Sequence, residues 1–154
     1  VKSLAGMNSK ILFIDTAGGT VSAEFIPLTG ESSENILTSA EFSKYTDKGR
    51  VLNEHFRSKF GTDMTGDSAY AYQSVIVLKN ALERAGSTDR DKIRDVLASL
   101  DITTEKEIVI PAARIKFNQD GQNEAAGLFI VQIQKGEYIP VWPEKYAKGQ
   151  IKIK

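Results

Sequence analysis

The stretch from Gly66 to Gly86 constrains the fold most, because it has the pattern of one long helix with both ends marked. Asp67 or Ser68 can accept a hydrogen bond from an unpaired backbone N–H at the start. Gly86 supplies the left-handed residue that often ends a helix. Apolar residues recur every three or four positions, which places them on one face: Ala71, Val75, Leu78, Leu82 and Ala85, widened by Tyr72 and Ile76. We therefore expect a helix packed on most of its sides, with its first turn as the part that can face a ligand.

A short apolar strand, Lys10–Ile14, comes before this helix and ends in a glycine-rich turn that begins at Asp15. A continuous apolar run with polar borders is typical of a strand buried on both faces of a parallel sheet. Open α/β sheets bind ligands at the carboxyl ends of their strands, where this turn lies. The Asp15 carboxylate has two candidate roles. It can hydrogen-bond to its own turn, or it can act as a ligand carboxylate or hydrogen-bond acceptor in a cleft.

The remaining pattern predicts an α/β domain that finishes in a β-hairpin. The linkers between its three long helices have ordinary lengths. The hairpin turn is Lys135-Gly136, and Pro140 restricts the returning strand to a sheet edge. The expected helices are 22–26, 48–60 with the stripe Leu52, Phe56 and Phe60, 66–86, and one that starts after the cap Ser87-Thr88-Asp89; the expected strands are 10–14, 35–39, 107–110, 113–117, 128–134 and 137–142.

The composition excludes several classes of function. Twenty basic and twenty acidic side chains give a net charge of +0, which offers no basis for binding nucleic acid or an anionic membrane. With no cysteine and one histidine, His55, the chain has no recognisable metal site and no nucleophile–base pair. Gly18-Gly19 lacks the lysine of a phosphate-binding loop. We therefore expect no enzymatic activity and no cofactor.

Several stretches, taken in order, resemble the carboxyl-terminal part of type I periplasmic solute-binding proteins of the branched-chain amino acid transporter group. The likeness spans nearly the whole chain and rests on these stretches at matching separations: Leu4-Ala5-Gly6-Met7 with Lys10–Asp15, Gly30–Leu37, Phe56–Gly61, Ala69–Val75, Ala81–Ser87, Ile93–Leu97, Ile115–Gln122, Val131–Gly136 and Val141-Trp142-Pro143. One departure is Gln73, where members usually carry Asp, and we expect that position to be structural.

The resemblance implies a three-layer fold with a mainly parallel sheet flanked by helices, which is incomplete in this chain. It implies two lobes, with second-lobe elements at about 1–37 and 128–154 and first-lobe elements at about 38–123. The ligand would lie between the lobes and contact Asp15, Thr16 if the register slips by one, Asp67 and Ser68. An amino acid ligand would place its ammonium group on Asp15.

The implied function is that of a periplasmic or cell-surface receptor that captures an amino acid or small carboxylate for the membrane components of an ABC importer by lobe closure. Two alternatives stay open: a sensory ligand-binding domain of a receptor or regulator with the same fold, and a fragment of an α/β enzyme. We also expect the isolated chain, as an excised piece, to form a homodimer or exchange strands, or to be marginally stable.

Overall fold

The computed structural model describes residues 1–7 and 9–153, which divide into two compact units. Unit 1 comprises Val1–Gly66 and Phe129–Lys154, and unit 2 comprises Asp67–Leu128. The assignment of residue ranges to the two lobes of the family remains a prediction.

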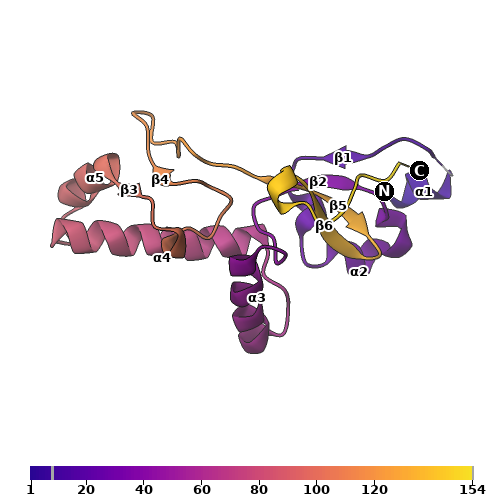
Figure 1. Ribbon diagram of the computed structural model, residues 1–154, viewed down its shortest axis with the longest axis horizontal. Helices are drawn as coiled ribbons and strands as arrows, with labels where there is room; N and C mark the ends of the chain where they lie inside the picture. Colours follow the sequence, from indigo (N-terminus) through magenta and orange to yellow (C-terminus); the bar gives the residue numbers. More distant parts are fainter. Residues whose placement is uncertain (8, 154) are drawn as a thin grey trace. The chain divides into compact units, whose positions relative to one another are not determined.

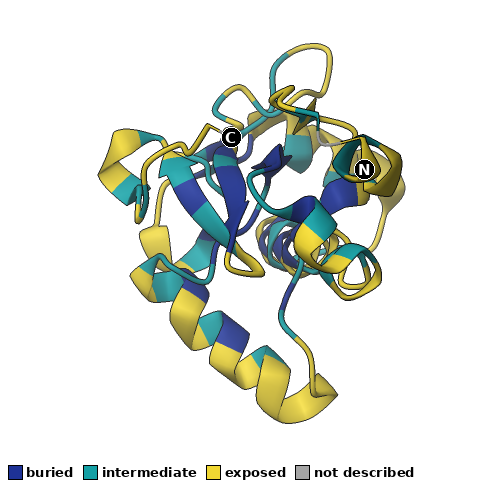
Figure 2. Ribbon diagram, turned by 90° about the vertical axis from the view of Figure 1, so that its right-hand side faces the viewer, coloured by how far each residue is buried: buried dark blue, intermediate teal, exposed yellow. Residues whose placement is uncertain are grey.

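Unit 1 contains a four-stranded sheet in the order β1-β2-β5-β6 (Figure 1). β1 (Ile14–Asp15) pairs in parallel with β2 (Leu37–Ala40), whereas β5 (Phe129–Gln134) pairs antiparallel with both β2 and β6 (Glu137–Trp142). The α/β fold class is confirmed. Within this sheet, β1 and β2 form the parallel pair, and the other two pairs are antiparallel. Most residues of β2 and β5 are buried, as Figure 2 shows in dark blue.

The first strand differs from its prediction. Only Ile14 and Asp15 form it, and it lies at the sheet edge rather than between two covered faces. Ile11 and Ile14 are 70% and 59% exposed. The apolar run 10–14 predicts burial, but β1 is an edge strand. Among the described residues no strand pairs with its outer side, so its apolar side chains stay exposed.

The hairpin is confirmed, with positive φ at Lys135 and Gly136 and with β6, which carries Pro140, at the sheet edge. β5 has no solvated face, although its sequence ends in alternation. Gln132 is fully buried and hydrogen-bonds through its amide to the backbone of Lys152 and Asn35. The carboxyl-terminal residues therefore cover this polar position.

Unit 1 contains the helices α1 (Lys2–Gly6), α2 and α3, of which α3 begins with a side-chain cap. The helix predicted at 22–26 is wrong in its bounds, because α2 spans Phe25–Thr29 and follows a 3₁₀ turn, η1 (Gly19–Val21). Pro27 does not stop α2, because it lies in the first turn, where no intrahelical N–H is needed. α3 (Asp47–Phe60) begins at Thr46, whose side chain accepts a hydrogen bond from the Gly49 N–H, and ends at Gly61.

The buried residues of α3 are Gly49 and Asn53, not the predicted apolar stripe, and Phe60 is 59% exposed. His55 is exposed. Gly49 is required because a Cβ there would collide with the backbone carbonyl oxygen of Ser43.

Unit 2 contains two α-helices, a two-stranded sheet and a 3₁₀ turn, η3 (Glu105–Glu107). Its helices are α4 (Gly66–Ala85), whose first residue belongs to unit 1, and α5 (Arg90–Ser99), which Asp89 caps as predicted. β3 (Asp101–Ile102) pairs with β4 (Ile115–Lys116), and the strand predicted at 107–110 does not form. Its core gathers Leu100, Ile102, Ile108 and Ile115.

The packing of α4 differs from its prediction. Val75 and Leu78 of the apolar stripe are 66% and 49% exposed, whereas Ala69, Gln73, Asn80 and Ala81 are buried. Gln73 donates to the Glu107 carbonyl oxygen over 2.9 Å and accepts from the Val109 N–H over 2.7 Å. The structural role expected for Gln73 is therefore confirmed. These two hydrogen bonds hold residues 107–109 against α4, where the segment does not form the predicted strand.

Candidate ligand-binding site

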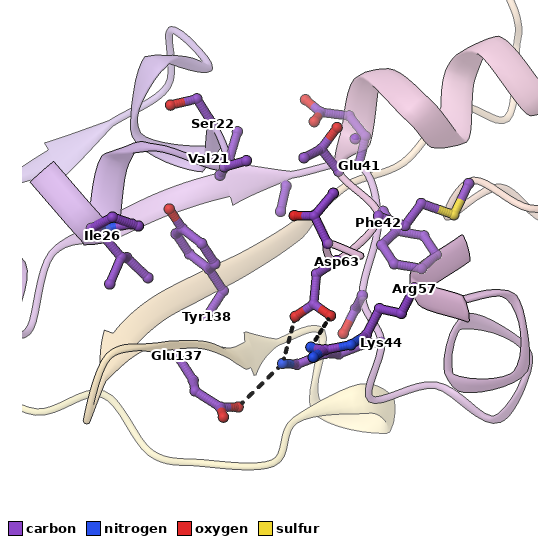
Figure 3. Close-up of a pocket in the computed structure, with 18 of the residues that line it drawn as sticks. Val21, Ser22, Ile26, Glu41, Phe42, Lys44, Arg57, Asp63, Glu137 and Tyr138 are labelled. Atoms are coloured by element: carbon purple, nitrogen blue, oxygen red, sulfur yellow. Dashed lines mark hydrogen bonds and ion pairs between the residues drawn. The ribbon is translucent and has the colours of Figure 1, made fainter. Parts of the chain in front are cut away.

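A pocket of about 440 Å³ lies within unit 1. Four segments form it: the end of η1 with the start of α2, the chain that leaves β2, the end of α3 with the following linker, and the β5–β6 hairpin. Its volume falls in the range of about 300–1,000 Å³ that is usual for small-molecule sites. Figure 3 shows the side chains that converge on it.

Asp63 joins three of the charged and polar side chains of this region. It accepts hydrogen bonds from Lys44 over 3.0 Å, from Arg57 over 2.7 Å and from Asn53 over 2.9 Å. Burial acts to raise the pKa of Asp63, but these three hydrogen bonds outweigh it and bring the pKa to about 2. Asp63 is therefore ionised over the physiological range.

The hairpin supplies a second carboxylate to the same cluster. Glu137 accepts a hydrogen bond from the Tyr45 hydroxyl and lies 3.5 Å from the Lys44 ammonium. These two contacts hold the pKa of Glu137 below its ordinary value, with the Tyr45 hydrogen bond as the larger cause. Burial and the Glu137 hydrogen bond raise the pKa of Tyr45. The cluster thus ties the hairpin to the chain that leaves β2.

Local backbone geometry brings Asp63 to this position. Gly61 has a φ of +73°, which turns the chain back along α3 after its last turn. Asn53, only 6% exposed on α3, then accepts a hydrogen bond from the Met64 N–H over 2.8 Å. This fixes the linker 62–66 as one wall of the pocket.

Glu41 lies at the carboxyl end of β2 and also lines the pocket. It is partly buried, and its carboxylate packs against Gly66. Among the described residues it has no hydrogen-bond donor and no cationic partner. Figure 3 accordingly draws no dashed line to Glu41, in contrast to Asp63 and Glu137.

Asp15 hydrogen-bonds to its own turn and does not line this pocket. Its carboxylate accepts from the Ala17 N–H over 3.0 Å, from the Thr20 N–H over 3.3 Å and from the Thr20 hydroxyl over 2.7 Å. The Thr20 hydroxyl is the main cause that lowers the pKa of Asp15. The turn role is therefore the one that the geometry supports directly, and ligand contact by Asp15 or the exposed Thr16 remains a prediction.

The Asp15 turn also positions part of the pocket wall. Thr20 lies 2.8 Å from the Thr38 hydroxyl, and its carbonyl oxygen accepts a 2.6 Å hydrogen bond from Tyr138. Burial raises the pKa of Tyr138 to about 12, so this hydroxyl stays protonated. The turn is thereby fixed to β2 and β6, directly before the pocket residues Val21 and Ser22.

Asp67 and Ser68 lie in the first turn of α4, as predicted, where Asp67 is exposed and Ser68 half-buried. They belong to unit 2, whereas Asp15 and Thr16 belong to unit 1. Contact of either residue with a ligand remains a prediction.

No sequence pattern predicted five charged residues of the pocket: Glu41, Lys44, Arg57, Asp63 and Glu137. A signal for Glu41 was nevertheless available. It directly follows β2, and Asp15 is the last residue of β1, the parallel strand beside β2. The carboxyl ends of parallel strands lie at the same edge of the sheet. A carboxylate at the end of β2 is therefore as well placed to contact a ligand as Asp15 is.

Within residues 1–7 and 9–153, no group of three or more histidine and carboxylate side chains has a geometry that could hold a metal ion. Over the same residues, every helix is too short or too polar to cross a membrane.

An α/β fold with a small-molecule pocket at the carboxyl end of a strand is an arrangement that suits the binding of a small ligand. The model of the periplasmic binding protein family matches residues 4–137. The chain belongs to this family. Membership in a family of binding proteins agrees with the expectation that the chain is not an enzyme.

Among curated proteins, the chain is similar to Leu/Ile/Val-binding protein homolog 7 of Brucella melitensis biotype 1. The two are 29% identical over 101 residues, which are 65% of this chain and 25% of the relative. The chain therefore spans about a quarter of the length of the curated relative it matches.

Two solved structures show the same fold. A leucine binding protein, LivK, from Thermotoga maritima matches with a TM-score of 0.74 and 19% identity, over 90% of this chain and 39% of that chain. The leucine-, isoleucine-, valine-, threonine- and alanine-binding protein from Brucella ovis, in a closed conformation, matches with a TM-score of 0.75 and 12% identity, over 97% and 41%. The predicted type I periplasmic-binding-protein fold is confirmed.

Proposed function

We propose that this chain is a ligand-binding region of an extracytoplasmic solute receptor, which captures an amino acid or small carboxylate for an ABC importer by lobe closure. The observation that carries the proposal is the family match over residues 4–137. The names of the relatives, which refer to leucine, isoleucine and valine, favour an aliphatic amino acid as ligand.

The pocket in unit 1 supports the proposal through its chemistry. Its wall combines the apolar side chains of Val21, Ile26, Phe42 and Met64 with a few charged groups. Sites for small ligands commonly combine an apolar lining with a small number of polar groups that orient the ligand.

Asp15, Thr16, Asp67 and Ser68 are proposed as ligand contacts, with Asp15 as a candidate contact for the ammonium group of an amino acid. A carboxylate has about four lone-pair positions. The turn occupies three of those of Asp15, which leaves about one for a ligand. The lowered pKa keeps this carboxylate in the ionised form that an ammonium group requires.

The test is a thermal-shift screen of the protein as its gene encodes it, against amino acids and small organic acids. A ligand at 100 times its dissociation constant should stabilise the folded state by about 2.7 kcal/mol. Isothermal titration calorimetry then confirms binding, and recovery of the unmodified ligand excludes turnover. Chemical conversion of the ligand, or no hit in the whole screen, would contradict the proposal.

A periplasmic or cell-surface location is part of the same proposal and has its own test. Osmotic shock of the native cells should release the protein with the periplasmic fraction, or protease should reach it at the cell surface. Retention with cytoplasmic markers would contradict it.

A further inference from the structure

The pocket of unit 1 contains one carboxylate that no described residue neutralises. Five of its lining side chains are charged: Glu41, Lys44, Arg57, Asp63 and Glu137. Asp63 lies 2.7 Å from Arg57 and 3.0 Å from Lys44, and Glu137 lies 3.5 Å from Lys44. Glu41 is left as one negative charge in excess.

The position of Glu41 makes this charge available to a ligand. The residue is partly buried at the carboxyl end of β2, where its carboxylate packs against Gly66. A carboxylate that has lost part of its hydration and has gained no protein donor is stabilised by any cation that enters beside it. The two cations of the pocket are already engaged by Asp63 and Glu137, so a cation must come from outside.

The rest of the pocket limits what that cation can be. Phe42 and Met64 are 9% and 8% exposed, and with Val21 and Ile26 they give the pocket an apolar wall. An apolar wall beside an unpaired carboxylate suits a primary ammonium group that carries a hydrocarbon body, rather than a strongly hydrated metal ion.

We propose that Glu41, rather than Asp15, binds the ammonium group of a small ligand whose apolar part packs against Phe42 and Met64. This inference rests on the proposed function and narrows the class of ligand. The proposed ligands are amino acids and small carboxylates, and only amino acids carry an amine. Glu41 would then determine specificity for the amine.

The test compares three related probes by isothermal titration calorimetry. They are leucine, 4-methylpentanoate, which lacks the amine, and 3-methylbutylamine, which lacks the carboxylate. The variants are Glu41→Gln and, as a matched control, Glu24→Gln, an exposed residue that does not line the pocket. Glu41→Gln should leave the unfolding temperature unchanged, because Glu41 has no partner to lose.

We expect the wild-type protein to bind leucine about tenfold or more tightly than 4-methylpentanoate, a difference of about 1.4 kcal/mol. Glu41→Gln should weaken binding of leucine and of 3-methylbutylamine by about tenfold or more, and leave that of 4-methylpentanoate unchanged. Glu24→Gln should bind all three probes as the wild type does.

The outcomes separate this inference from the proposed function. Leucine binding that survives Glu41→Gln, or equal affinity for 4-methylpentanoate, overturns the role of Glu41 and leaves the receptor function intact. If Asp15→Asn weakens the binding of leucine and Glu41→Gln does not, the ammonium site belongs to Asp15. This outcome also overturns the role of Glu41. If the wild-type protein binds no amino acid and no small carboxylate, both proposals fail.

Discussion

At the scale of single residues, Asp63 shows how one carboxylate can fix a pocket wall. It contacts α3 through Asn53 and Arg57, and the chain after β2 through Lys44. A change to Asn keeps the shape of the side chain and removes its charge. The residue therefore offers a direct measure of what the charge contributes.

We predict that Asp63→Asn lowers the free energy of unfolding by about 1 kcal/mol. The side chain is 37% exposed, so solvent screening reduces the contribution of its charged hydrogen bonds. Urea unfolding at pH 7 measures the change. Asp120→Asn is the control, because this exposed turn residue has no side-chain partner among the described residues. Equal stability of the two variants would contradict the assigned role.

The lowered pKa of Asp63 also predicts a pH dependence. Its pKa in the folded chain is about 2, below the ordinary value of 3.8, so the folded state binds the proton less tightly than the unfolded chain does. The stabilisation is fully present above about pH 5 and is lost as the pH falls through 3.8 toward 2. The difference in unfolding free energy between wild type and Asp63→Asn should therefore shrink on acidification. Urea unfolding from pH 7 down to about pH 3 checks this, and a constant difference would be the opposite result.

At the scale of elements, α4 separates what local sequence determines from what packing determines. Gly86 ends this helix as its type predicts, with a φ of +55°. The buried face, by contrast, is set by Gln73 and Asn80, which hydrogen-bond to the 107–109 segment and to Glu107. Val75, in the apolar stripe, stays exposed.

This arrangement predicts that one substitution has a small effect on stability at one position of α4 and a large effect at another. Val75→Glu should change the free energy of unfolding by less than about 0.5 kcal/mol, because Val75 is 66% exposed. Ala81→Glu should cost about 2 kcal/mol or more, because Ala81 is fully buried and a carboxylate at this position would lose its hydration. Urea unfolding of dilute protein compares them. The reverse order would restore the apolar stripe as the packed face.

The same distinction explains how much of the fold and of the site could be predicted. The ends of α3, α4 and α5 follow from capping residues such as Gly61 and Asp89, which act within one turn. β3 could not be predicted, because it has two residues and depends on pairing with β4. The Asp15 turn is local and was identified. The pocket cluster joins residues as distant as Tyr45 and Glu137, which are 92 positions apart, and no pattern along the sequence encodes that meeting.

At the scale of the whole molecule, apolar side chains of the described residues stay exposed in both units. One such surface is the edge strand β1 with Ile11 and Ile14, and another is the stripe of α4 with Val75 and Leu78. A strand edge presents unpaired backbone N–H and C=O groups that another chain can complete. Apolar side chains beside such an edge add a hydrophobic gain to that pairing.

We predict that the 154-residue chain associates with itself as its concentration rises, by pairing of β1 edges. Ile14→Lys should shift the distribution toward monomer, because a lysine on an edge strand opposes pairing with a second copy through its charge. Sedimentation velocity over a concentration series measures the effect. Val75→Glu, which removes an exposed apolar residue from α4 but leaves β1 intact, separates the two surfaces: if it alone abolishes association, the α4 stripe is the interface. A single monomeric species at every concentration would contradict the prediction. It would show that neither surface holds two copies of the chain together.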